Sequence, residues 1–182
     1  MAPEMENMAL VQRLNSIFER FDFVTLRDAL EGGDTVAMTT ELGDLSREVA
    51  ESVDQHVVVE FIGDQPLVEG RVFIGVQGWI ELWASWLAAF DSYSLTGSDY
   101  EAISEQVMAK AVHRGRGRFS GLEIELVQWQ LWELSGGKVV RVRMYDTRDE
   151  ALSCARAAAF SIGWRPTWLA FAGISARATE PG

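Results

Sequence analysis

From Tyr93 to Tyr145, hydrophobic and polar residues alternate with a period of two, which is typical of β-strands with one buried face. The alternation predicts strands over residues 93–103, 106–118, 122–134 and 138–145. Ser120-Gly121 and Ser135-Gly136-Gly137 supply turn residues between neighbouring strands. We therefore expect this part of the chain to form an antiparallel sheet.

Helical spacing of apolar residues dominates the chain before the sheet. One helical segment is predicted from about Glu4 to Glu31, and shorter helices are predicted for Asp34–Leu42 and for "LSREVAES". The β-branched run in "QHVVVEF" predicts a strand, and a second strand is expected to end near Phe73.

A second group of helices flanks the meander. Residues 79–90 carry an aromatic stripe at helical spacing, which we expect to lie against a sheet. A last helix is predicted from Thr147 to about Ala159. Helices followed by a long antiparallel meander indicate the α+β class.

The face of the sheet that should turn inward carries unexpected polar residues. Gln128 and Gln130 alternate with Leu126 and Trp132 on one side of their strand. The neighbouring strands add Ala109, Ala111, His113, Val140, Val142 and Met144 to this face. Buried amides cost stability without partners, and small alanines leave volume, so the pattern favours a cavity lined by a few polar groups. The alternative is that the glutamines bond to nearby backbone and that His113 is an ordinary core histidine.

The opposite face has an apolar centre surrounded by charged residues. Val127, Trp129 and Leu131 form this centre. Such a patch predicts a homodimer interface, although the apolar C-terminal tail could also cover it.

Composition removes several classes of function. The net charge of −11 makes nucleic acid an unfavourable partner, and the arginines of "RGRGR" are expected to lie on a solvated strand face. No stretch has the length and apolarity of a membrane span or the pattern of a signal peptide, so we expect a cytoplasmic protein. A single cysteine, Cys154, and two histidines without paired spacing argue against a metal site.

Three segments together resemble a known superfamily. They are "GDLSREVAESVDQHVVVEF", "FIGVQGWIELWASWLAAF" and "RGRGRFSGLEIELVQWQLWELSGGKVVRVRMYDTRDEAL". They are similar to the SnoaL-like and ketosteroid isomerase-like branch of the nuclear transport factor 2-like superfamily. The resemblance implies a cone-shaped curved antiparallel sheet that wraps helices around an internal pocket. It also implies a core over residues 43–159, after a helical N-terminal extension over 1–42 and before an apolar tail over 160–182.

The resemblance also implies a set of site residues. Glu60 falls at the position of a carboxylate general base, Gln130 near an inward acid that stabilises an oxyanion, and His113 near an inward aspartate of related epoxide hydrolases. Other pocket-lining residues would be Val58, Trp83, Ala111, Gln128, Trp132, Val142 and Met144. Alternation in "HVVVEF" points the other way for Glu60, because it groups Val57, Val59 and Phe61 as the buried set.

Two functions fit these expectations. The first is a cofactor-independent enzyme acting on a small, mostly apolar carbonyl compound by proton abstraction, as an isomerase, cyclase or lyase, with His113 as an alternative base. The second is a non-catalytic module that binds a small molecule or assembles as a dimer, because a fold does not decide a function.

Overall fold

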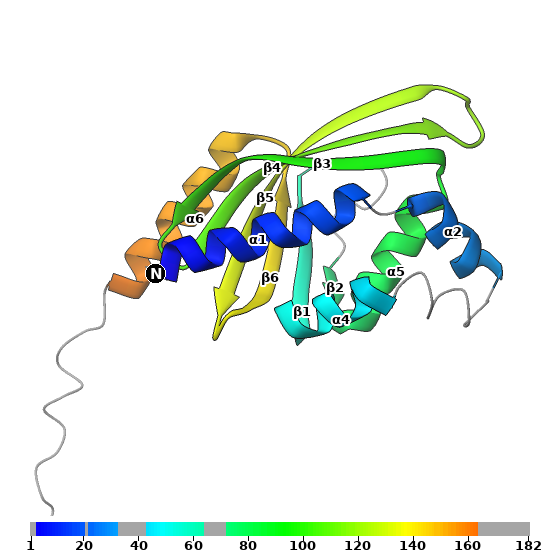
Figure 1. The fold of residues 1–182 in the computed structure, drawn as a ribbon. Helices are drawn as coiled ribbons and strands as arrows, with labels where there is room; N and C mark the ends of the chain where they lie inside the picture. The colour runs from blue at the N-terminus through cyan, green and yellow to red at the C-terminus, as the bar shows by residue number, and fades with distance from the viewer. Residues whose placement is uncertain (1–2, 21, 33–42, 64–71, 164–182) are drawn as a thin grey trace, which may run out of the picture.

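The computed structural model describes residues 3–20, 22–32, 43–63 and 72–163 (Figure 1). Its elements are α1 (Pro3–Arg20), α2 (Phe23–Gly32), α4 (Gly43–Ser52), β1 (Val53–Ile62), β2 (Val72–Ile74), α5 (Gly75–Leu87), β3 (Phe90–Ile103), β4 (Gln106–Gly117), β5 (Glu123–Ser135), β6 (Lys138–Tyr145) and α6 (Arg148–Gly163). The helix expected over Asp34–Leu42 and residues 164–182 of the expected tail lie outside the described residues.

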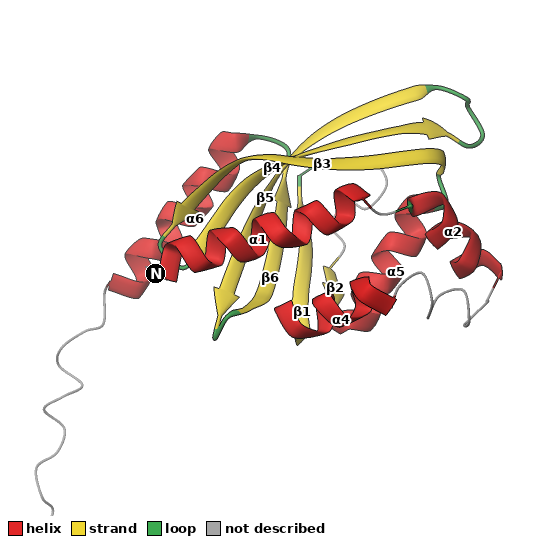
Figure 2. Cartoon of the chain, in the orientation of Figure 1, coloured by secondary structure: helices red, strands yellow, loops and turns green. Residues whose placement is uncertain are grey.

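The strands form one curved, open sheet in the order β2-β1-β6-β5-β4-β3. Neighbouring strands are antiparallel except for β1 and β6, which run parallel. Figure 2 shows α1 lying across one side of this sheet and α6 on the other. The predicted α+β fold, a curved sheet around helices, is confirmed.

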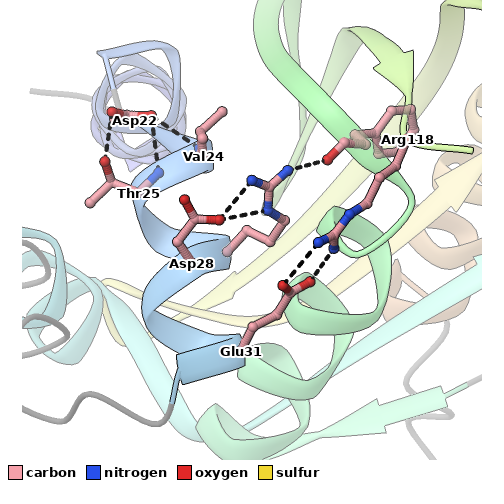
Figure 3. A network of polar contacts seen from close by, with 8 residues as sticks. Asp22, Val24, Thr25, Asp28, Glu31 and Arg118 are labelled. Atoms are coloured by element: carbon pink, nitrogen blue, oxygen red, sulfur yellow. Dashed lines mark hydrogen bonds and ion pairs between the residues drawn. The ribbon is translucent and has the colours of Figure 1, made fainter. Parts of the chain in front are cut away.

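The first helical segment is two helices rather than one. The helical segment is interrupted at Asp22, whose carboxylate accepts hydrogen bonds from the backbone N–H groups of Val24 and Thr25, at 3.0 and 3.2 Å. The Thr25 hydroxyl, which also donates to this carboxylate, and the two backbone bonds hold the pKa of Asp22 below its ordinary value. An N-cap of this kind begins a new helix, so α2 takes its own direction (Figure 3).

Ion pairs and hydrogen bonds hold α2 against the β3–β4 end of the sheet. Arg27 donates to the backbone carbonyl of Phe90 at 2.6 Å and also pairs with Asp28. Arg118, which follows β4, pairs with Glu31 at 2.5 Å (Figure 3). The α2 helix is therefore fixed beside α5, where its Phe23 stacks on Trp83.

The aromatic stripe of α5 packs inward, as predicted. Trp79 and Trp86 are buried, and Trp83 stacks on Phe18 of α1 and Phe23 of α2. The helix ends at Leu87 rather than Phe90, because Phe90 pairs with Gly117 and begins β3. Gly115 on β4 leaves the space for that ring, since a Cβ there would lie 2.6 Å from a Phe90 ring carbon.

A smaller apolar cluster lies on the outer face of the sheet, beneath α6. Met108, Leu131 and Tyr145 pack there against Ala151 and Ala155. Leu131, the last residue of the predicted apolar patch, is fully buried within the chain itself. Val127 and Trp129 remain half-buried, and the guanidinium of Arg148 lies 5.8 Å from the Trp129 ring.

One inward assignment on β6 is wrong. The pairing of β5 with β6 shifts between Glu133↔Arg141 and Leu134↔Val139, so Val140 is an extra residue in the ladder. As a result Val139, not Val140, is buried in the main core. None of the described helices has the length and apolarity needed to cross a membrane.

Candidate functional site

Two small cavities lie on the inner side of the sheet, between it and helix α5, and helix α1 also lines one of them. The Gln130 cavity, of about 20 Å³, is lined by Asn15, Phe18, Val59, Trp79, Leu82, Trp83, Leu95, Gln130, Trp132, Val142 and Met144. The Gln128 cavity, also about 20 Å³, is lined by Phe61, Leu82, Trp83, Trp86, Tyr93, His113, Gln128 and Met144. Each has room for roughly one water molecule.

A histidine and a tyrosine form the polar centre of the Gln128 cavity. The Tyr93 hydroxyl lies 2.5 Å from Nδ1 of His113. Burial lowers the pKa of His113 to about 4, so its imidazole is neutral at neutral pH. Gln128 lies close enough to oppose part of this shift, although its amide lacks hydrogen-bond geometry to the ring. Burial also raises the pKa of Tyr93, which keeps the phenol protonated.

Several polar atoms around this cavity have no hydrogen-bond partner among the described residues. They are Nε1 of Trp83, Nε1 of Trp86, Nε2 of His113 and both amide atoms of Gln128. Gln128 is only 1% exposed. Buried polar atoms without partners are unfavourable by about 1–3 kcal/mol each. A polar group placed in this cavity would remove much of that cost.

The polar groups of the Gln130 cavity are better satisfied. The Trp132 indole donates to Oε1 of Gln130 at 3.1 Å, and Nδ2 of Asn15 donates to the Tyr100 hydroxyl at 3.1 Å. Burial raises the pKa of Tyr100. Gly97 makes room for this second pair, because a Cβ there would overlap the Tyr100 hydroxyl.

Glu60 lies on the other side of β1. It is part-exposed and sits 3.9 Å from Nε of Arg141, whereas Val59 and Phe61 line the inner cavities. Neither cavity includes Glu60 or Val58. The family resemblance implies that Glu60 and Val58 point into the pocket, and this is wrong for both residues. The alternation of apolar residues in β1 correctly predicts that they point away from the inner cavities.

Most of the other expected residues do lie together on the inner side. Those that line a cavity are Trp83, His113, Gln128, Gln130, Trp132, Val142 and Met144. Ala111 is buried on the same face, where it pairs with Gln128, but it lines neither cavity.

Sequence reasoning missed Asn15, Trp86 and Tyr93 as parts of the site. Asn15 had a readable signal, because it falls at helical spacing from the buried residue Val11. The helical spacing of Trp86 predicts only that it packs with the other aromatic residues of α5. Tyr93 lies near the start of a strand, where alternation is weakest.

No family model and no curated protein matches the sequence. Solved structures do match. A candidate SnoaL-like polyketide cyclase from Jannaschia sp. CCS1 aligns with a TM-score of 0.55 and 16% identity, over 87% of this chain and 96% of that one. Bal32a, from a soil-derived mobile gene cassette, aligns with a TM-score of 0.58 and 11% identity, over 82% and 95%.

A nuclear transport factor 2-like protein of unknown function from Burkholderia pseudomallei K96243 aligns with a TM-score of 0.53 and 14% identity. That alignment covers 81% of this chain and 95% of the other. At these identities the likeness concerns the backbone arrangement. The chain has the nuclear transport factor 2-like fold, the fold it shares with SnoaL-like proteins.

Proposed function

We propose that this chain is a cofactor-independent enzyme that takes a small, mostly apolar carbonyl compound into the inner cavities and moves a proton next to the carbonyl. The reaction class is isomerisation, cyclisation or elimination, as in SnoaL-like and ketosteroid isomerase-like proteins. The observation that carries the proposal is the set of unpartnered polar atoms around the Gln128 cavity. Aromatic walls suit an apolar ligand, and these atoms suit its oxygen.

In this proposal His113, rather than Glu60, is the general base. Its Nδ1 is engaged by Tyr93, and its unpartnered Nε2 belongs to a ring that lines the cavity. With the proton on Nδ1, Nε2 carries the free lone pair and can accept a proton from the carbon next to the carbonyl. The electron pair of that C–H bond moves into the enolate, and the imidazolium later returns the proton to a different carbon of an isomerising substrate.

Nearby donors stabilise the enolate oxygen. The indole N–H of Trp86 and the amide N–H of Gln128 are buried beside His113 and unpartnered. A buried imidazole whose pKa is about 4 is a weak base in the empty site. The negative charge that forms on the enolate stabilises the adjacent imidazolium, and this raises the basicity of the ring when it is needed. Gln130, in the neighbouring cavity, positions the ligand.

The test is proton exchange into deuterated water, because it requires no knowledge of the physiological product. Apolar ketones are incubated with the protein in D₂O, and loss of the hydrogen next to the carbonyl is followed by NMR. We expect His113→Gln to slow the exchange by about 10²- to 10⁴-fold. His56→Gln, the matched change at an exposed histidine, and Glu60→Gln should leave it unchanged. Exchange that survives His113→Gln, or that depends on Glu60, would refute the assignment.

A non-catalytic binding module is the second candidate. The observation in its favour is that neither cavity is lined by a carboxylate that could act as the base, because Glu60 lies on the other side of β1 beside Arg141. The same experiment separates the two. Ketones that change the tryptophan fluorescence without any hydrogen exchange identify a binding protein.

A further inference from the structure

The β4–β5 hairpin continues past the end of β6, which leaves part of β5 with a strand on one side only. The register between β5 and β6 ends at Trp129↔Tyr145, whereas the register between β4 and β5 continues to Arg116↔Glu123. Among the described residues, no strand pairs with the other side of β5 over residues 123–127. Figure 1 shows this hairpin, in lime green, extending away from β6. We call this stretch the free edge of β5.

The backbone of the free edge carries hydrogen-bonding groups that point away from β4. In an antiparallel ladder, residues that bond to the neighbouring strand alternate with residues whose N–H and C=O groups point to the opposite side. The backbone N–H of Gly117 donates to the carbonyl of Leu122 at 2.9 Å, and the register continues from this pair without a shift. The residues whose backbone groups point away from β4 are therefore Glu123, Glu125 and Val127. A further strand would bond to these groups.

The side chains of the hairpin provide a different neighbour on each face of an added strand. On the inner face, Leu122 and Ile124 are 66% and 41% exposed. On the outer face, Glu123 and Glu125 are exposed. Side chains on the same face of adjacent strands interact in pairs. A strand that fits this edge therefore has apolar residues on one face and basic residues on the other.

The charge of the free edge favours a basic partner over a second copy of the same edge. The register places Arg116 opposite Glu123, but Nε of Arg116 donates to the backbone carbonyl of Gly121 at 3.2 Å. Two copies of this edge would bring glutamates beside glutamates, and like charges on adjacent strands oppose pairing. The net charge of −11 also attracts a basic segment over longer distances.

The pairing of β5 with β6 shows the same complementarity within the chain. On β6, Arg141 and Arg143 alternate with Val142 and Met144. Arg141 lies opposite Glu133 in the register, and Arg143 forms an ion pair with Glu133. Strand β5 thus already pairs, along its other part, with a strand in which basic and apolar residues alternate.

We propose that the free edge of β5 binds an extended segment of another protein, in which apolar residues alternate with lysine or arginine. The segment adds a strand to the sheet and continues the ladder at the point where β6 leaves β5. Its backbone bonds to residues 123–127, its apolar side chains cover the exposed leucine and isoleucine, and its basic side chains pair with the two glutamates. This site is separate from the inner cavities and does not depend on the chemistry of His113.

The test titrates the full chain with a peptide of about eight residues, long enough to span the edge, in which arginine and valine alternate. Exchange of backbone amide hydrogens is followed by NMR. We expect the amides of Glu123, Glu125 and Val127 to exchange rapidly in the free chain and at least about tenfold more slowly with saturating peptide. A peptide of the same composition with its arginines and valines in separate blocks should bind about tenfold more weakly, the effect of losing one or two hydrogen bonds. Equal binding of the two peptides would indicate general charge attraction and would contradict strand addition.

One pair of variants tests the charge of the edge. Glu123→Lys should weaken binding of the alternating peptide about tenfold, because it places like charges on adjacent strands. Glu105→Lys makes the same change of charge at an exposed position between β3 and β4 and should leave the affinity unchanged. Equal losses in both variants would mean that only the total charge matters, and the assignment to this edge would be wrong.

A second pair tests the backbone of the edge. Glu125→Pro removes an N–H that points away from β4, a position where an edge strand tolerates proline, and it should abolish binding. Glu125→Gln removes the same charge but keeps the N–H, so it should weaken binding only severalfold. Equal affinities of these two variants would contradict backbone pairing.

Amide exchange in the free chain also identifies any other occupant of the edge. If the edge amides are already protected at every protein concentration, the chain itself covers the edge and the proposal is wrong. Protection that increases with protein concentration would assign the edge to a second copy and would also overturn the proposal. If the alternating peptide leaves the exchange rates unchanged at millimolar concentration, no strand is added and the proposal fails.

Discussion

The hydroxyl of Tyr93 lies 2.5 Å from Nδ1 of His113, while Nε2 of the same ring has no hydrogen-bond partner among the described residues. The two residues come from adjacent strands, because Leu95 of β3 pairs directly with His113 of β4 and Tyr93 is its diagonal neighbour. One ring nitrogen is thus held by the sheet and the other is left for a ligand. This asymmetry is what the proposed general base requires, whereas a core histidine that serves only packing has both nitrogens satisfied.

Tyr93→Phe tests whether this contact orients the ring. The variant keeps the aromatic packing but leaves Nδ1 of the buried His113 without a partner, so we expect a loss of about 1–3 kcal/mol in the free energy of unfolding. Hydrogen exchange of a bound ketone should slow while ketone affinity stays nearly the same. Urea unfolding and the NMR exchange assay measure the two effects. An unchanged exchange rate would show that the tyrosine is only structural.

Burial of His113 should make stability depend on pH. Its pKa is about 4 in the folded chain against an ordinary value of 6.5, so the unfolded chain binds the proton first as the pH falls. The contribution of neutral His113 to the free energy of unfolding is fully present above pH 6.5. It is lost as the pH falls from 6.5 to about 4, a total loss of about 3 kcal/mol.

The measurement is urea unfolding at several pH values over this range. His113→Gln should remove this part of the pH dependence, and His56→Gln, at an exposed position, should keep it. The carboxylates titrate alike in all three proteins, so the difference between the profiles reports His113. Parallel profiles for the wild type and His113→Gln would contradict the prediction.

Strand alternation predicts most of the inner face correctly. Gln128, Gln130 and Trp132 are all buried, because a residue's side of the sheet follows directly from its parity within a regular strand. The same rule is right for Glu60, where the family resemblance is wrong. At that position the burial of apolar side chains is a better guide than the family resemblance, because turning Glu60 inward would expose Val57 and Val59 to solvent.

The exceptions arise where regular geometry stops. Val140 is misassigned because a bulge changes the parity of β6, and bulges leave little trace in a single sequence. The sequence does not reveal the break between α1 and α2 at Asp22, because the helical spacing of apolar residues continues through it. The Tyr93–His113 contact depends on the relative register of two strands, which alternation within each strand does not determine.

The two buried glutamines should respond differently to the same substitution. Gln128 has both amide atoms unpartnered, so Gln128→Met removes a desolvated polar group and should leave stability unchanged or raise it. Gln130 accepts a hydrogen bond from the Trp132 indole, so Gln130→Met leaves that N–H buried without its partner and should cost about 1–3 kcal/mol. Thermal and urea unfolding of both variants measure the difference. Equal effects would mean that water or another group already satisfies Gln128.

The outer face of the sheet remains a predicted homodimer interface, now reduced to the part beside α6. Helix α6 covers Leu131, whereas Val127 and Trp129 are half-buried, with the ion pair of Arg114 and Glu125 nearby. An apolar centre with a charged rim is the usual anatomy of an interface between subunits.

We expect the wild type to be a dimer by light scattering at micromolar concentration. Trp129→Glu should be a monomer, because a buried carboxylate without a partner opposes association. Ile80→Glu, a matched change at a part-exposed residue of α5 on the other side of the sheet, should remain dimeric. A monomeric wild type would refute the proposed interface. If only Ile80→Glu loses the dimer, the interface lies on the helical side of the sheet instead. Ketone binding by monomeric Trp129→Glu would then show that the inner cavities belong to a single chain.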